Sequence, residues 1–170
     1  MNLKTASLAD PAVVPLWING EATTSSPPIT FIVTSVSKPQ ETPITAHSAD
    51  GDAATRAADA AWAAFGSWKK TSPQTRRDLL LRVATAYESR MQQLIEAQVQ
   101  ETSCTEQWAQ MNVNYAIELL KETASRVTGV AGEIPQVMDH NKLALVFREP
   151  LGPILTIAPS VMLSLEIAKS

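Results

Sequence analysis

The sequence predicts an α/β protein in which an N-terminal β-hairpin and a run of helices lead into a single strand of a parallel sheet. Three observations support this class: β-branched segments lie near both ends of the chain, helical spacing fills the middle, and Pro150-Leu151-Gly152-Pro153 separates two apolar runs. A doubly wound domain needs several further βαβ units of roughly 30 residues each. Because only 11 residues follow Pro159, we expect only the first strand of a Rossmann-type sheet, over residues 154–157.

The first predicted elements are short strands. Asn19-Gly20 follows Leu16-Trp17-Ile18 and tolerates the positive φ angles of a type I′ turn, so a hairpin is expected there. Residues 29–36 are rich in β-branched side chains and predict a strand, and residues 42–46 predict its short partner. We assign residues 1–15 to a flexible arm, residues 16–159 to an incomplete N-terminal domain and residues 160–170 to a divergent C-terminal tail.

From Ser48, the expected N-cap of a first helix, the apolar spacing becomes helical. Alanines between residues 53 and 64 recur at this spacing and predict close packing against another element. A second helix begins at Ser72-Pro73, with proline at its first position. A third runs from residue 91 to about residue 101. The fourth carries Trp108, Met111, Tyr115 and Leu119 on its predicted apolar face and ends near Thr128-Gly129.

A last strand is predicted from Lys142 to Arg148, directly before the glycine turn.

Composition restricts the partners that this chain can take. The net charge is -3 and the pI is about 5.4, so no basic field favours nucleic acid. No apolar run approaches the roughly 18 residues of a membrane span, and residues 1–15 show no signal-peptide pattern. A single cysteine suits a reducing compartment. We therefore expect a cytoplasmic protein with no nucleic-acid and no membrane partner.

The only thiol, Cys104, lies between two helical segments, with Glu101 and Glu106 nearby in the sequence. Negative neighbours disfavour the thiolate that a nucleophile requires, so Cys104 is interpreted as a structural cysteine. His47 and His140 are expected in loops without ligand-spaced partners, which argues against a metal site. Glycine-rich phosphate loops and a Gly-x-Ser-x-Gly elbow are absent from the sequence. The aromatic residues at helical spacing, Trp62, Phe65, Trp68 and Trp108, are interpreted as core or capping residues and not as an aromatic binding face.

Several motifs in order resemble the N-terminal part of the aldehyde dehydrogenase superfamily. They are Trp17-Ile18-Asn19-Gly20-Glu21, Ala60-Ala61-Trp62-Ala63-Ala64-Phe65, Arg76-Arg77, Gly132-Glu133-Ile134-Pro135 and Arg148-Glu149-Pro150-Leu151-Gly152. Glu101-Thr102, Trp108-Ala109, Asn112 and Leu143-Ala144 are most similar to the salicylaldehyde, or aromatic aldehyde, dehydrogenase branch. The resemblance extends from about Trp17 to Pro159.

The resemblance implies NAD or NADP as the family's cofactor, running beside the positions of Ile157, Ala158 and Pro159. In this chain we expect these three residues to be a vestige of that site, because no partner strands are present to build its crevice. The family continues with Pro-Trp-Asn, whose asparagine stabilises the oxyanion, whereas Pro159 is followed here by Ser160-Val161. The family's catalytic Cys and Glu would lie beyond Ser170. We therefore expect no catalytic residue, no cofactor and no metal for this chain.

Three functional hypotheses remain from the sequence. The first is a truncated aldehyde dehydrogenase-like protein that is inactive alone, although its relatives oxidise aromatic aldehydes to acids. The second is a non-enzymatic partner that modulates a full-length aldehyde dehydrogenase, or forms a homo-oligomer, through the edge of the strand from Lys142 to Arg148. The third is one half of a split enzyme. An in-frame catalytic Cys and Glu in the DNA immediately downstream would favour a split or longer enzyme.

Overall fold

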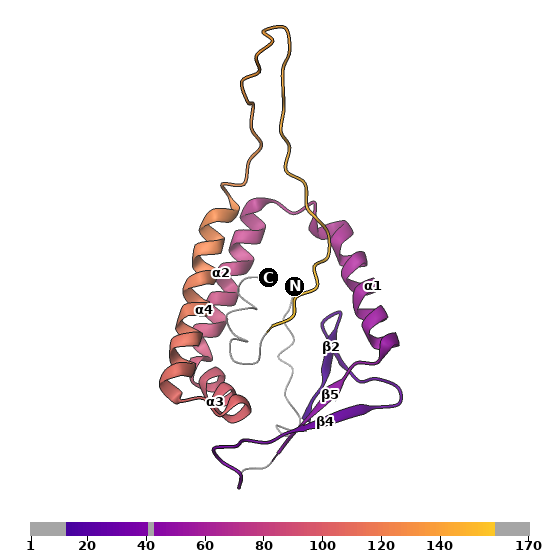
Figure 1. The fold of residues 1–170 in the computed structure, drawn as a ribbon, viewed down its shortest axis with the longest axis vertical. Helices are drawn as coiled ribbons and strands as arrows, with labels where there is room; N and C mark the ends of the chain where they lie inside the picture. The colour runs from indigo at the N-terminus through magenta and orange to yellow at the C-terminus, as the bar shows by residue number, and fades with distance from the viewer. Residues whose placement is uncertain (1–12, 41–42, 159–170) are drawn as a thin grey trace.

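The computed structural model describes residues 13–40 and 43–158, and combines two small sheets with four helices (Figure 1). The larger sheet has the order β1-β5-β4, formed by Val13–Val14, Ile44–Ser48 and Ile29–Val33. Strand β1 pairs with β5 in parallel, and β4 pairs with β5 antiparallel. The α/β class predicted from the sequence is confirmed. Residues 1–12 of the predicted N-terminal flexible segment lie outside the described residues. The same holds for Pro159 and for the predicted C-terminal tail, residues 160–170.

The predicted hairpin is confirmed. Strands β2 (Leu16–Ile18) and β3 (Glu21–Thr23) pair antiparallel across a turn at Asn19 and Gly20, whose φ angles of 54° and 77° are those of a type I′ turn. The next two strands differ from their predicted bounds. Strand β4 stops at residue 33 and not at residue 36, and β5 covers residues 44–48 and not 42–46. Strand β1 lies within residues 1–15, the segment that we assigned to a flexible arm.

The helices begin close to their predicted caps. Helix α1 spans Gly51–Trp68, and its N-cap is Asp50, whose Oδ1 accepts a hydrogen bond from the backbone of Ala53 at 2.7 Å. The prediction of Ser48 as this cap is wrong, because Ser48 ends β5. Helix α2 spans Pro73–Ser89 and is capped by Ser72, as predicted. Helices α3 (Met91–Thr102) and α4 (Glu106–Val127) follow, and α4 ends beside Thr128-Gly129 as expected.

The core lies where α2 and α3 pack against α4, on the side of the molecule opposite α1 (Figure 1). The buried cluster consists of Ala84, Ile95, Ala109, Val113, Ala116, Ile117 and Leu120. Three of its seven members are alanines, one from α2 and two from α4, and the other four are larger aliphatic residues. The tertiary core of the described chain is therefore a three-helix unit, and the strands add little to it.

Helix α1 departs most from expectation. Only Ala53 among its residues is buried, while Trp62 is 62% and Trp68 is 43% exposed. The predictions that its alanines pack closely and that its tryptophans are core residues are wrong for the described part of the chain. The physical reason is its position, since α1 stands apart from the α2–α3–α4 unit (Figure 1). Its contacts with β2 and with the chain at Gly152 leave both tryptophans largely exposed.

After α4 the chain runs outward and returns as a long, narrow excursion, which we call the arm (residues 130–150; Figure 1). Its two legs are joined by an isolated antiparallel bridge, in which Glu133 and Val146 exchange backbone hydrogen bonds of 3.0 and 2.9 Å. The predicted strand from Lys142 to Arg148 is therefore wrong, because the legs are in register at this one position and form no continuous ladder.

The predicted Rossmann-type strand is also absent over residues 154–157. Ile154, Leu155 and Ile157 are 69%, 87% and 84% exposed. A strand is defined by backbone hydrogen bonds to a neighbouring strand, and no described residue supplies them. Within the described ranges, no helix combines the length and the apolar character needed to span a bilayer.

Candidate functional site

Residues 157–159, which the family resemblance places beside the cofactor, follow the glycine turn at Gly152. This glycine has φ 114°, a conformation that side chains rarely adopt, and a Cβ placed on it would lie 3.7 Å from Cη2 of Trp62. The chain at Gly152 therefore runs close to the six-membered ring of Trp62 in α1. Beyond it, Ile157 is exposed and Ala158 is half-buried, while Pro159 lies outside the described residues.

Cys104 is a packing residue in the short connection between α3 and α4. It is half-buried against the helical core, and its thiol donates a weak hydrogen bond to the Gln98 carbonyl oxygen at 3.9 Å. Burial raises the pKa of the neighbouring Glu101 carboxyl above its ordinary value. His47 lies in β5, contrary to its predicted loop position, and His140 lies in the arm. No hydrogen bond joins either imidazole to the thiol in the part of the chain described here.

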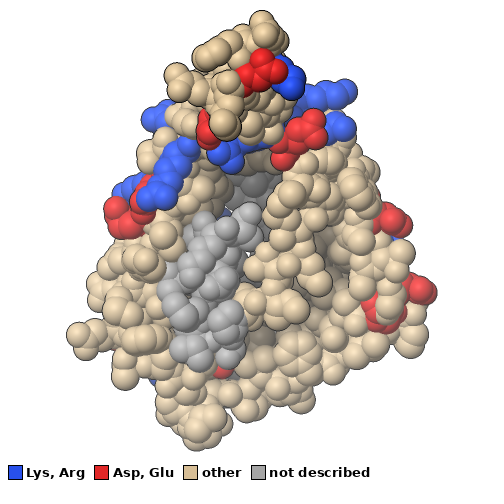
Figure 2. All heavy atoms as spheres, turned by 45° about the horizontal axis from the view of Figure 1, so that its top comes forward, with Lys and Arg blue, Asp and Glu red and all other residues tan. Residues whose placement is uncertain are grey.

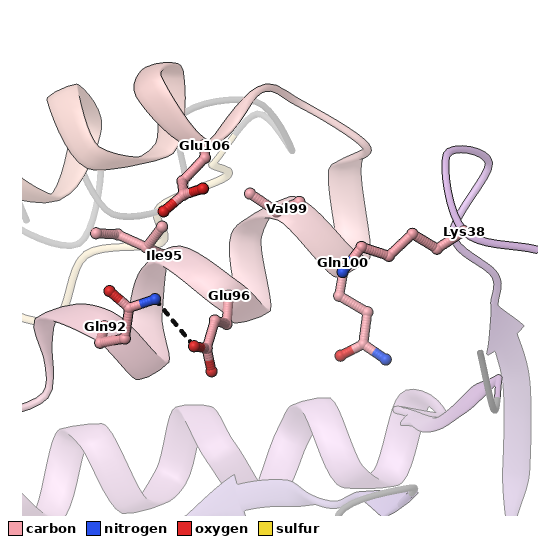
Figure 3. A pocket seen from close by; sticks show the side chains of 7 residues that line it. All are labelled: Lys38, Gln92, Ile95, Glu96, Val99, Gln100 and Glu106. Atoms are coloured by element: carbon pink, nitrogen blue, oxygen red, sulfur yellow. Dashed lines mark hydrogen bonds between the residues drawn. The ribbon is translucent and has the colours of Figure 1, made fainter.

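A pocket of about 440 Å³ lies along α3 and is lined also by Lys38 and by Glu106 in the first turn of α4 (Figure 3). Gln92 Nε2 donates a hydrogen bond to Glu96 Oε1 at 2.9 Å within it. Lys38 reaches from the connection after β4 toward Gln100, near the C-terminal end of α3, where the helix dipole favours a cation (Figure 3). The lining contains carboxylates, amides and one ammonium but no thiol, hydroxyl or imidazole, so it suits polar binding and not covalent catalysis.

A second, open pocket of about 500 Å³ lies on α4, lined by Gln107, Gln110, Met111, Asn114, Tyr115 and Glu118. Met111 is 50% and Tyr115 is 54% exposed, and Trp108, one turn earlier, is 41% exposed. The sequence predicted these three side chains for the buried face. The structure instead buries the smaller residues of α4 and leaves its largest apolar side chains on another face.

The second face was missed because the apolar residues of α4 were treated as one stripe. Ala109, Val113, Ala116 and Leu120 already form a complete stripe at helical spacing. The helix carries three further large apolar residues outside this stripe: Trp108, Met111 and Tyr115. Their presence in the sequence was the available indication that α4 has a second apolar surface.

Charged side chains are gathered around the base of the arm, with Lys and Arg beside Asp and Glu (Figure 2). Two ion pairs lie within the arm itself: Arg148 Nη2 lies 3.3 Å from Glu133 Oε1, and Lys142 Nζ lies 3.2 Å from Asp139 Oδ2. Backbone and side-chain hydrogen bonds from Asn141 and Lys142 lower the pKa of the Asp139 carboxyl. No group of three or more His, Cys, Asp or Glu side chains is placed to hold a metal ion among the residues that the structure describes.

The chain belongs to the aldehyde dehydrogenase family, whose model matches residues 26–160. It is similar to a salicylaldehyde dehydrogenase of Pseudomonas putida, with 39% identity over 106 residues that cover 62% of this chain and 22% of the relative. The resemblance seen in the sequence motifs is thus confirmed. The matched part spans about a fifth of the length of that relative.

Solved structures agree with this assignment. The crystal structure of a salicylaldehyde dehydrogenase from Pseudomonas putida G7, complexed with salicylaldehyde, matches with a TM-score of 0.82 and 33% identity, covering 92% of this chain and 33% of that one. A betaine aldehyde dehydrogenase from Staphylococcus aureus in complex with NAD+ matches with a TM-score of 0.83 and 20% identity, covering 91% and 31%. The second likeness shows the fold alone.

Proposed function

We propose that this chain contributes to the NAD(P)-dependent oxidation of aromatic aldehydes to acids, and that it does not catalyse this reaction alone. Its similarity to salicylaldehyde dehydrogenases supports both the reaction class and the aromatic substrate. The family's binding of NAD(P), together with the resemblance of residues 157–159 to cofactor-side positions, supports the choice of cofactor.

The proposal of an aromatic aldehyde as substrate is supported chiefly by the second apolar face of α4. Met111 and Tyr115 line an open pocket there, with Trp108 exposed one turn away. Aromatic rings and a thioether offer large, polarisable contact area to a flat ring, while Gln110 and Asn114 can orient polar substituents. We infer that this face forms one wall of an aromatic aldehyde site.

Aldehyde oxidation also requires an activated thiol, a base and an oxyanion donor. Cys104 is half-buried in the helical core, and its hydrogen bond goes to a backbone carbonyl and not to a base. The position that follows the family's Pro-Trp carries Val161, which has no donor. These features support a structural and substrate-contacting role for the chain and no complete catalytic site.

We therefore expect no reduced cofactor when the purified chain is mixed with salicylaldehyde and NAD or NADP. The measurement is the absorbance of the reduced nicotinamide, with Cys104→Ala as the matched control that should give the same baseline. Turnover that disappears in Cys104→Ala would mean that the thiol is activated in a way that its packing does not indicate.

A second candidate function is that of an interaction partner, and the exposed apolar side chains of the arm favour it. Leu143, Leu145 and Phe147 are 73%, 51% and 77% exposed on the leg that the sequence predicted as a strand. Unpaired backbone on such a segment can recruit a strand from another chain. We propose that this leg joins a second copy or a longer aldehyde dehydrogenase and modulates it.

Gly132→Ala should weaken any association through the arm. A Cβ at residue 132 would lie 2.3 Å from the carbonyl oxygen of Val146, so the two legs must separate. We expect faster hydrogen exchange at the Glu133 and Val146 amides, and a lower sedimentation coefficient at equal concentration. Gly66→Ala in α1 is the control, because a Cβ there meets nothing within 4 Å. Unchanged assembly in Gly132→Ala, with the bridge amides deprotected, would exclude the arm as the interface.

A further inference from the structure

Arg76 lies near the N-terminus of α2 and binds the end of the preceding helix. Its Nε donates a hydrogen bond to Thr71 Oγ1 at 3.0 Å, and its Nη2 donates to the carbonyl oxygens of Lys69 and Thr71 at 3.3 and 3.2 Å. Its guanidinium carbon lies 5.9 Å from the centroid of the Trp68 ring, within range of a cation–π contact. One side chain of α2 therefore holds the last residue of α1 and the connection that follows it.

The position of this charge favours α1 and not the helix that carries it. A cation is unfavourable near a helix N-terminus and favourable near a C-terminus, where the last carbonyl oxygens lack intrahelical partners. Helix α1 has no basic residue in its last turn, and α2 has no acidic residue in its first turn to offset Arg76. This arrangement indicates that Arg76 serves the orientation of α1.

Few other described contacts fix α1 to the helical unit. Helix α1 packs against β2 and stands apart from the α2–α3–α4 unit (Figure 1). It ends at Trp68 and α2 begins at Pro73, so residues 69–72 alone join the two helices in sequence. Arg76 is half-buried, and its planar fork forms charge-assisted hydrogen bonds in a fixed geometry. It is therefore suited to set the angle between α1 and α2.

Helix α1 carries a continuous series of side-chain contacts from this end to the chain after the arm. Lys69 Nζ lies 5.5 Å from the centroid of the Phe65 ring, and the Phe65 and Trp62 rings meet edge to face with centroids 5.7 Å apart. The six-membered ring of Trp62 lies close to Gly152, where a Cβ would be 3.7 Å from Cη2. The orientation of α1 therefore decides whether the Trp62 ring supports the turn at Gly152.

We propose that Arg76 is a positioning residue, which acts through α1 and Trp62 on the turn at Gly152. By fixing α1 to the N-terminus of α2, Arg76 keeps the Trp62 ring at the turn that leads to residues 157 and 158. Because α2 packs against α4, the same contact relates this segment to the second apolar face of α4. The importance of these two residues for NAD(P) rests on the proposed function, whereas the contacts of Arg76 do not.

The backbone amide signal of Gly152 in NMR spectra of the isotope-labelled full chain tests the proposal. An aromatic ring shifts the signals of nuclei close to it, so Trp62→Leu should displace the Gly152 signal. Arg76→Ala should displace this signal in the same direction, by about half or more of that amount, and should add nothing further in the Trp62→Leu background, because coupled positions are not additive.

Arg77→Ala is the matched control, because Arg77 is the neighbouring residue and pairs with Asp78 at 3.5 Å on the surface. It should leave the Gly152 signal in place. Arg76→Lys keeps the charge without the planar fork, so it should also displace the signal. The amide signals of Val113 and Ala116 in the buried core should stay unchanged in every variant, which checks that the helical unit is folded.

A Gly152 signal that stays in place in Arg76→Ala would overturn the proposal, and so would an equal displacement in Arg77→Ala. If Arg76→Ala does not fold, Arg76→Lys decides, and an unchanged Gly152 signal in that variant overturns the proposal. A purely local role of Arg76 would change only the signals of residues 69–72. No variant is judged by turnover, so a failure of the proposed aldehyde oxidation would leave the NMR result unaffected.

Discussion

Leu120→Ala is expected to lower the free energy of unfolding by about 2–5 kcal/mol. Leu120 is 3% exposed and packs in the core between α2 and α4 with Val113, Ala116 and Ala84. Few large apolar residues are buried in the described chain, and most of the core consists of alanines. A single-domain protein has only about 5–15 kcal/mol of stability in total, so this loss should move the urea midpoint well below that of the parent.

The matched control is Leu143→Ala, which removes the same atoms from a side chain that is 73% exposed in the arm. Surface changes of this kind are usually within about 0.5 kcal/mol of neutral. Urea unfolding followed by circular dichroism compares the two. Equal losses in both variants would contradict a core confined to the α2–α3–α4 unit.

Ser103→Ala should destabilise the chain by about 1–2 kcal/mol. Ser103 Oγ accepts hydrogen bonds from the backbone N–H of Val36 at 2.9 Å and of Ser37 at 3.2 Å, and so ties the connection after β4 to the end of α3. Water can partly replace these exposed bonds, which places the expected cost toward the lower value. Hydrogen exchange should show the loss as faster exchange at these two amides.

Ser103→Gly separates the effect of losing the hydroxyl from the effect of the left-handed backbone conformation. Residue 103 ends α3 with φ 57°, a left-handed conformation that glycine adopts without the cost of a Cβ. We therefore expect Ser103→Gly to be more stable than Ser103→Ala while losing the same two hydrogen bonds. If Ser103→Ala unfolds at the same urea concentration as the parent chain, the connection is held by other contacts.

The features predicted correctly were those encoded by neighbouring residues. Asn19-Gly20 determines its own turn because both residues tolerate positive φ, and Ser72-Pro73 starts α2 because proline fits the first helical position. The family membership was likewise readable, since ordered motifs are a property of the chain and not of its contacts. The α4 pocket was not predicted, because the sequence does not reveal which of two apolar stripes meets a neighbouring helix.

The sequence by itself therefore determined the family, the α/β class, the helices and the hairpin turn. Tertiary structure alone decided which apolar side chains are buried and which extended segments become strands. Val13–Val14 forms a strand because β5 lies beside it, whereas residues 154–157 are a longer run with three β-branched side chains and form none. The physical reason is that a helix satisfies its backbone hydrogen bonds within one segment, while a strand must obtain them from a partner whose position is set by the rest of the fold.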